Sequence, residues 1–234
     1  MQLSRRLLMN ASLVTPGNRL ADVGTDHGYI PIALVQEGKI PCALAMDVNR
    51  GPLLRAEEHI RETGLAPSIK TRLSDGVSML RPGEADSVLV AGMGGPLMIR
   101  ILREGEKVLE SVKELILQPQ SEIAQVRRFL ETAGYRITDE DMVYEDGKYY
   151  AAMRAVHGDM AWEQEIFYRY GKLLLEGRHP VLKQFLMERG RICRQILDSL
   201  REKGRDTERT ESRIQEMEEE LALTGAGLKY YEMQ

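Results

Sequence analysis

The sequence predicts an α/β protein whose sheet is mostly parallel, with an antiparallel hairpin at one edge and a helical coiled-coil domain at the C-terminus. Three observations support this fold class. Between residues 19 and 133, five apolar runs alternate with segments of helical periodicity. Two further strand patterns flank Asp146-Gly147, a strong hairpin signal. From Trp162 onward only helical periodicity remains, so we expect one domain over residues 1–158 and another over residues 159–234.

Length and composition exclude several classes of protein. With 234 residues, 43% of them hydrophobic, the chain can bury a substantial core and is not a disordered tail. The only cysteines, Cys42 and Cys193, are too few for a disulfide framework or a zinc site, so no metal is expected. No apolar run approaches the ~18 residues that a membrane span needs. We therefore expect a cytoplasmic protein without membrane attachment.

The charge is unevenly distributed along the chain. Residues 169–213 contain 12 Lys and Arg against 7 Asp and Glu, whereas residues 1–168 contain 19 against 24. A basic segment joined to an acidic body indicates a polyanionic partner. Such charge runs are more often solvated helix faces, and that alternative stays open.

The first strand and the bend after it organise the predicted binding site. A helical pattern over residues 3–14 precedes an apolar run over residues 20–23, and helical periodicity returns over residues 29–37. The bend, Gly24-Thr25-Asp26-His27-Gly28, lacks the third glycine of the dinucleotide motif. An acid two places before the first glycine, Asp22, together with three polar residues in the bend, suits a ligand with an amine or a sulfonium group. This pattern indicates S-adenosylmethionine.

The next two strands also end near carboxylates. The second apolar run, residues 42–46, is closed by Asp47, which lies 25 residues after Asp22. That offset is close to the ~20 residues at which an acid reaches a ribose hydroxyl pair. The weak edge-strand pattern of residues 69–73 is followed by Asp75, where a nucleoside pocket would place the amine of adenine. Each acid could also be a plain strand-end or turn residue.

A glycine-rich loop follows the fourth strand. Residues 87–90 are apolar and run into Ala91-Gly92-Met93-Gly94-Gly95-Pro96, whose glycines allow the backbone to approach a ligand closely. Pro96 starts a helical pattern that extends to Leu109, and the fifth strand, residues 115–117, ends at Gln118. The hairpin strands then cover residues 135–138, 142–145 and 148–156.

The C-terminal segment has breaks at Gly171, at residues 177–180 and at Gly204. Its apolar residues follow a spacing of three and four, which is typical of two paired helices. These residues are Leu182, Leu186, Cys193, Ile196, Leu200, Ile214, Met217 and Leu221. We expect an antiparallel hairpin connected at residues 204–207, with a loose tail over residues 224–234.

Several motifs resemble the bacterial tRNA (adenine-N1)-methyltransferases that act on adenine 22, over residues 3–156. They are Leu3-Ser4-x-Arg6-Leu7, the run from Ala21 to Pro31, Asp47-Val48-Asn49-x-Gly51-Pro52-Leu53, Gly83-Glu84-Ala85-Asp86, the run from Ala91 to Gly95, and Leu117-Gln118-Pro119. The family's helical C-terminal domain corresponds in character to residues 160–223.

The resemblance implies a Rossmann-like methyltransferase fold, S-adenosylmethionine as donor and tRNA as acceptor. Asp22 and Gly24 would hold the methionine side of the cofactor, Asp47 the ribose, and Asp75 with Gly76 the adenine. The remaining expected cofactor contacts are Thr25, Gly28, Ala91 and Gly92. We expect Met93, Gly94 and Gln118 to face the substrate.

The expected chemistry is transfer to a ring nitrogen. N1 of adenine has an in-plane lone pair, so attack on the methyl group needs alignment more than a base. The loop at residues 91–96 also lacks the amide and aromatic residues of amine methyltransferases. Asp26 and His27 are the candidate catalytic residues, because a polar group beside the acceptor can stabilise the developing cation. His27 could equally be a structural helix-start residue.

The basic C-terminal segment would grip tRNA phosphates, which helps to turn the base out of its stack. The candidate contacts are Arg169, Lys172, Arg178, Lys183, Arg189, Arg191 and Arg194. Two alternatives stay open: a methyltransferase that acts on another RNA, a protein or a small molecule, and a non-catalytic RNA-binding protein. The oligomeric state is not predicted.

Overall fold

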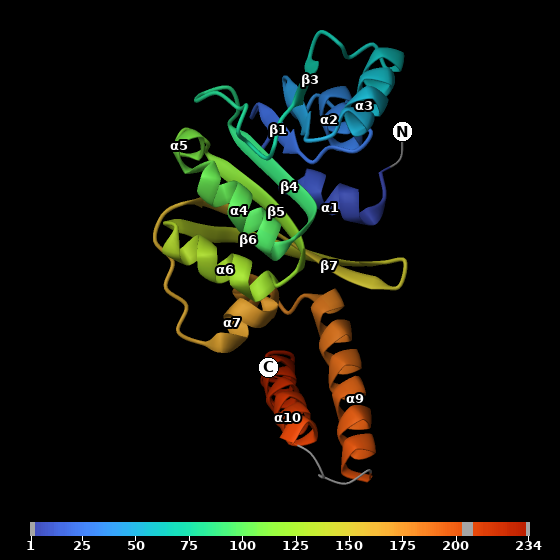
Figure 1. Cartoon of the computed structure of the whole chain (residues 1–234), viewed down its shortest axis with the longest axis vertical. Helices are drawn as coiled ribbons and strands as arrows, with labels where there is room; N and C mark the ends of the chain where they lie inside the picture. Colours follow the sequence, from blue (N-terminus) through green and yellow to red (C-terminus); the bar gives the residue numbers. More distant parts are fainter. Residues whose placement is uncertain (1–2, 203–207, 233–234) are drawn as a thin grey trace. The chain divides into compact units, whose positions relative to one another are not determined.

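The computed structural model describes residues 3–202 and 208–232 (Figure 1). The chain divides into two compact units, Met1–Ala161 and Trp162–Gln234, which are taken in turn. Within the described residues, none of the helices combines the length and the apolar character that crossing a membrane requires.

The first unit contains one seven-stranded sheet with the order β3-β2-β1-β4-β5-β7-β6. Strands β1 to β5 run parallel, whereas β7 is antiparallel to β5 and β6. The strands are β1 Leu20–Val23, β2 Ala43–Asp47, β3 Ile69–Leu73, β4 Ser87–Gly94, β5 Glu114–Ser121, β6 Tyr135–Glu145 and β7 Lys148–His157. The predicted fold class, with β3 at one edge and an antiparallel hairpin at the other, is confirmed.

Helices cover the sheet in an order that follows from its topology. They are α1 Arg5–Leu13, α2 Tyr29–Gln36, α3 Arg50–Glu62, α4 Gly95–Glu104, α5 Glu106–Leu109 and α6 Ile123–Thr132. The strand order reverses between β1 and β4, and right-handed crossovers therefore place α2 and α3 on one face and α4 and α6 on the other. At such a switch point the strand ends open a crevice for a ligand.

The central strands are buried on both faces, which explains why they read as continuous apolar runs. Val88 and Leu89 of β4 and Leu115 of β5 are completely inaccessible to solvent. This core holds the carboxyl ends of β1 and β4 in fixed positions next to each other.

Three predicted boundaries in this unit are wrong. The glycine-rich segment after Val90 is not a free loop but the end of β4, because Ala91 pairs with Gln118 and Gly94 with Ser121, with register shifts at Met93. The predicted helix over residues 97–109 is interrupted at Gly105, where a Cβ atom would lie 2.2 Å from Val77. The strands predicted over residues 135–138 and 142–145 form one strand, β6, with an irregularity in its pairing to β7.

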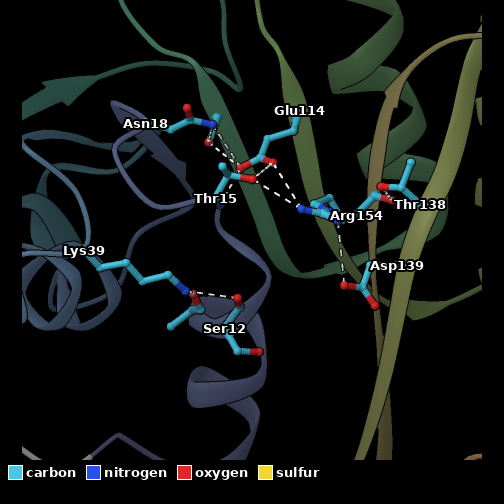
Figure 2. A network of polar contacts seen from close by, with 10 residues as sticks. Ser12, Thr15, Asn18, Lys39, Glu114, Thr138, Asp139 and Arg154 are labelled. Carbon is cyan, nitrogen blue, oxygen red and sulfur yellow. Dashed lines mark hydrogen bonds and ion pairs between the residues drawn. The ribbon is translucent and has the colours of Figure 1, made fainter.

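A buried carboxylate ties the start of β1 to the starts of β4 and β5 (Figure 2). Glu114 accepts hydrogen bonds from the Thr15 backbone N (2.8 Å), from the Thr15 hydroxyl (2.6 Å) and from the Ser87 hydroxyl (2.6 Å). Asn18 donates to Ser87 and Glu114 as well. Lys39 donates from Nζ to the Ala11 and Ser12 carbonyls at the end of α1. These contacts fix α1 against the sheet.

The second unit is helical throughout its described part. Its helices are α7 Glu165–Tyr170, α8 Lys172–Glu176, α9 Pro180–Glu202 and α10 Glu208–Lys229. The two long helices, α9 and α10, are antiparallel, since a Cβ atom on Gly227 would lie 3.0 Å from Leu186 while Arg201 pairs with Glu218 at 2.7 Å (Figure 1). The predicted connection at residues 204–207 lies outside the described residues.

The apolar seam between α9 and α10 contains Cys193, Leu197, Ile214 and Met217. The breaks predicted at Gly171 and at residues 177–180 coincide with the ends of α7 and α8. The prediction of a loose tail from Thr224 is wrong, because α10 continues to Lys229 and Thr224 is 1% exposed. Contacts with α9 and with Tyr170 keep this last part of α10 helical.

Candidate active site

A cavity of about 260 Å³ lies at the carboxyl ends of β1 and β4, at the switch point of the sheet. It brings together the first bend, the end of β4 and the helix that precedes β1. Its lining residues are Arg6, Leu7, Asp22, Gly24, Thr25, Asp26, Tyr29, Ile30, Ala91, Gly92 and Gln120. Six of the predicted site residues therefore share one hollow.

Asp22 is the buried acid of this cavity. It is 7% exposed, and burial raises its pKa to about 6; the nearby Asp47 charge adds to the rise, and the Thr25 hydroxyl opposes it. No charged side chain of the described residues pairs with Asp22. A cation placed next to it would favour the ionised form, so the site suits a ligand with a positive charge.

The backbone amides at the start of the first bend form hydrogen bonds within the protein. The amides of Gly24 and Thr25 both donate to the Met46 carbonyl, at 2.8 and 2.9 Å, so neither is available to cradle a phosphate. Gly24 has φ +76°, and a Cβ atom there would lie 2.2 Å from Cε of Met93. Met93 thus covers the bend from β4, and a larger residue at position 24 would displace it.

Asp26 and His27 are held by α3. Arg55 donates to Asp26 at 2.9 Å, and His59 donates from Nδ1 to the His27 carbonyl at 3.1 Å. His27 has φ +64°, a strained conformation for a residue with a side chain. Its Nε2 lies 3.4 Å from Asp26, and its buried Nδ1 has no hydrogen-bond partner in the described structure.

Three aromatic rings stack at the rim of the cavity. The ring of His27 lies 5.0 Å from that of Tyr29 and 5.2 Å from that of His59, and the three planes are within 19° of parallel. Tyr29 also lines the cavity. Tyr29, Arg55 and His59 were not predicted as site residues. Tyr29 lies in the motif from Ala21 to Pro31, and Arg55 and His59 are four residues apart on one helix, which puts them on the same face.

Asp47 and Asp75 do not line this cavity. Asp47 ends β2 and accepts a hydrogen bond from the Asn49 backbone N at 2.7 Å. Asp75, exposed after β3, pairs with Arg100 of α4 at 3.1 Å. The strand order therefore places Asp22, Asp47 and Asp75 along one edge of the sheet, not within one enclosed hollow. Gly76 has φ +55°, and a Cβ atom there would lie 2.9 Å from Ile101, which is a packing reason for glycine.

The remaining predicted residues of this unit surround the cavity. Gly28 precedes α2 in a left-handed conformation, and Gly94 pairs with Ser121 on β5. Gln118 is fully buried, and its side-chain oxygen accepts a hydrogen bond from Arg6 at 3.4 Å. Arg6 was not among the predicted site residues, although it lies in the motif Leu3-Ser4-x-Arg6-Leu7.

Comparison with known proteins identifies the family. A model of the methyltransferase domain family matches residues 3–153. The tRNA (adenine(22)-N(1))-methyltransferase of Bacillus subtilis is 37% identical over 159 residues, which cover 68% of this chain and 67% of that protein. The chain belongs to this methyltransferase family. The resemblance predicted from the motifs is confirmed.

Two solved structures of related proteins have the same fold over nearly the whole chain. The crystal structure of the Bacillus subtilis m1A22 tRNA methyltransferase has a TM-score of 0.85 and 29% identity, and the match covers 97% of this chain and 99% of that one. A Streptococcus pneumoniae relative, crystallised with S-adenosyl-L-methionine, has a TM-score of 0.81 and 32% identity. That match covers 94% of this chain and 100% of the relative.

In this member of the methyltransferase family, three of the predicted phosphate contacts have an internal partner. Arg169 and Arg189 both pair with Glu220, which is 6% exposed; the Arg189 distance is 3.1 Å. Lys172 lies 3.8 Å from Glu176 in the next turn. The four remaining candidates, Arg178, Lys183, Arg191 and Arg194, are exposed and form no ion pair within the described residues.

Proposed function

We propose that this protein transfers the methyl group of S-adenosylmethionine to N1 of adenine 22 in tRNA. The observation that supports it most directly is the cavity at the switch point, which joins a buried acid, the polar bend and the glycines of β4 in a chain of this family. A tRNA substrate implies that the protein works in the cytoplasm.

The residues present fit the cofactor. Asp22 is a desolvated carboxylate without a cationic partner among the described residues, which suits the amine of the methionine end. Asp47 would bind the ribose hydroxyls, and Asp75 with Gly76 the adenine, from the same edge of the sheet outside the cavity. Thr25, Gly28, Ala91 and Gly92 would complete the wall. The bound cofactor supplies an electrophilic methyl group on its sulfonium.

On the acceptor side, the chain positions the base and stabilises charge. Asp26 would accept a hydrogen bond from the 6-amino group of adenine and offset the positive charge that develops on the ring. His27 would assist it, and Arg55 holds the Asp26 carboxylate in place. Met93 and Gly94 would form the floor under the base, whereas the fully buried Gln118 would act only through Arg6, from which it accepts a hydrogen bond. Because N1 lies on the Watson–Crick edge, the base must leave its stack at a cost of about a few kcal/mol.

We assign cofactor binding to residues 1–158 and tRNA contact to residues 159–234. Arg178, Lys183, Arg191 and Arg194 are exposed and can meet phosphates directly. Lys172 is a weaker candidate because Glu176 lies beside it. Arg169 and Arg189 would reach a phosphate only by sharing their charge with Glu220.

The test is a methylation assay with labelled S-adenosylmethionine and unmodified tRNA, followed by nucleoside analysis. We expect 1-methyladenosine at position 22, and no product with a matched tRNA in which another base replaces adenine 22. Asp22→Asn should bind the cofactor weakly and lose the activity. Absence of 1-methyladenosine with the wild-type protein, or equal product from the control tRNA, would overturn the proposal.

A further inference from the structure

A second cavity, of about 380 Å³, lies in the first unit at the end of the sheet opposite to the candidate active site. Its wall is formed by side chains of α4, α5, α6, β6 and β7. Each of α4 and α6 starts after the carboxyl end of a parallel strand and leads back towards the start of the next strand, so their last turns lie at the amino ends of the strands. Among the described residues, none lines both this cavity and that of the candidate active site. The two cavities are therefore separate.

Two carboxylates without a cationic partner line the second cavity. Glu106 and Glu110 are four residues apart at α5, which puts them on the same face, and both are exposed. Among the described residues, no nitrogen of a Lys, Arg or His side chain lies within 4.0 Å of either carboxylate. Arg103 also lines the cavity, but its guanidinium lies over the ring of Phe129, 5.7 Å from the ring centre. The wall thus has two negative charges against one positive charge, which favours a cationic ligand.

The phenol of Tyr135 is a buried polar group of the same wall. Tyr135 is 8% exposed and lines the second cavity, and its hydroxyl has no hydrogen bond within the described residues. Burial raises the pKa of this phenol, and the charges of Glu106 and Glu110 raise it further. The hydroxyl therefore lies in the field of both carboxylates and stays protonated at neutral pH. A buried hydroxyl without a partner is unfavourable, and a hydrogen bond to a bound ligand would offset that cost.

His157 adds an aromatic ring and an acceptor to the second cavity. Its Nε2 lies 3.1 Å from the Leu109 carbonyl, and because a carbonyl only accepts, Nε2 carries a proton. In a neutral imidazole Nδ1 is then an acceptor, and it has no hydrogen bond within the described residues. The ring lies 4.6 Å from that of Tyr135. Together with Phe129, the wall therefore combines three aromatic rings with acceptors that have no donor.

We infer that this second cavity binds a small organic cation that has a flat apolar body and an amine or amidine group. The N–H groups of such a ligand would donate to Glu106 and Glu110, while its body would pack against the rings of Phe129 and Tyr135, which also attract a cation. An anion would be repelled by two unpaired carboxylates, and a neutral ring would leave both of them without a partner. The cavity has a volume typical of small-molecule sites. Because it lies away from the candidate active site, the inference does not depend on the proposed function.

The test uses three probes of nearly the same shape that differ in charge, namely benzamidine, benzamide and benzoate. NMR titrations of the ligand signals with the full chain measure their affinities. Benzamidine, the cation, should bind at least about tenfold more tightly than the neutral benzamide, the usual gain for a hydrogen bond to a charged group. Benzoate, the anion, should bind more weakly than benzamide. Equal binding of benzamidine and benzamide, tighter binding of benzoate, or no binding of benzamidine would overturn the inference.

Variants place the cation within the molecule. The double variant Glu106→Gln and Glu110→Gln keeps the shape of the wall and should weaken benzamidine binding about tenfold, with less than about a twofold change for benzamide. Tyr135→Phe keeps the ring and should weaken benzamidine binding about two- to fivefold. Glu62→Gln, an exposed position of α3 outside the cavity, is the matched control and should leave all affinities unchanged.

One further variant separates the two cavities. Asp22→Asn removes the acid of the candidate active site and should leave the affinity for benzamidine within about twofold of the wild-type value. A loss of benzamidine binding in Asp22→Asn would place the cation in the candidate active site and overturn the inference, as would an unchanged affinity in the double variant. Methylation of tRNA tests the proposed function separately, so the failure of either proposal can be recognised without the other.

Discussion

Arg55 of α3 donates a hydrogen bond of 2.9 Å to Asp26, a residue 29 positions earlier in the chain. His59, one turn further along α3, holds the backbone of His27 in the same bend. The helix α3, which follows β2, therefore holds the bend after β1 in place. These contacts give the candidate catalytic carboxylate a defined position although its side chain is 62% exposed.

We predict that Arg55→Ala lowers the single-turnover rate of methyl transfer by about two- to fivefold, because an exposed ion pair contributes only about 0.2 to 1 kcal/mol. The dissociation constant for S-adenosylmethionine should stay within twofold of the wild-type value. Arg61→Ala, an exposed arginine of the same helix, is the matched control. An equal loss of rate in both variants would show that Asp26 does not depend on Arg55.

Cofactor binding should depend on pH through Asp22. Burial raises the pKa of this carboxyl to about 6, and the ionised form is the one that pairs with an amine. The apparent affinity for S-adenosylmethionine should therefore fall about tenfold between pH 7 and pH 5, in proportion to the ionised fraction. Titration calorimetry across this range measures it. Asp22→Asn should bind weakly at every pH, and a wild-type affinity that is flat from pH 5 to 7 would contradict the assignment.

The raised pKa of Asp22 affects the stability of the free protein in the opposite direction: ionisation favours cofactor binding but costs folding free energy. A carboxyl whose pKa is raised in the folded protein contributes its stability below the unfolded pKa and loses it as the pH rises through the folded pKa. Asp22→Asn should therefore be more stable than the wild type at pH 7, by up to about 3 kcal/mol, with a difference that disappears below about pH 4. Urea unfolding at both pH values tests this. A variant that is less stable at pH 7 would mean that Asp22 has a structural partner.

For tRNA binding, we predict that Arg191→Gln and Arg194→Gln each weaken affinity and reduce the salt dependence by about one phosphate contact. Arg213→Gln on α10 is the control, because that arginine is exposed but pairs with Glu216 at 2.6 Å. Arg169→Gln should instead reduce the stability of the helical unit, since its guanidinium pairs with the buried Glu220. Filter binding at several salt concentrations separates these effects. Equal salt slopes for all variants would exclude α9 as a phosphate-binding surface.

Local patterns were enough to predict the sheet. The apolar runs, the hairpin at Asp146-Gly147 and the acids after the first three strands are properties of short segments, because a strand's burial and its ending depend on adjacent residues. Once the strands are parallel, their carboxyl ends share one edge, so the position of Asp22, Asp47 and Asp75 along that edge follows. The pairing of residues 91–94 with β5 did not follow, since glycine-rich sequences fit a loop and a strand end equally well.

By itself, the sequence of this protein determined the order of its elements, its family and the acids at its strand ends. Only the tertiary structure decided which side chains share the cavity. Arg6 reaches Gln118 across 112 residues and Arg55 reaches Asp26 across 29, while Arg169 and Arg189 pair with Glu220. Such contacts depend on how distant helices pack, and no periodicity within one segment records that packing.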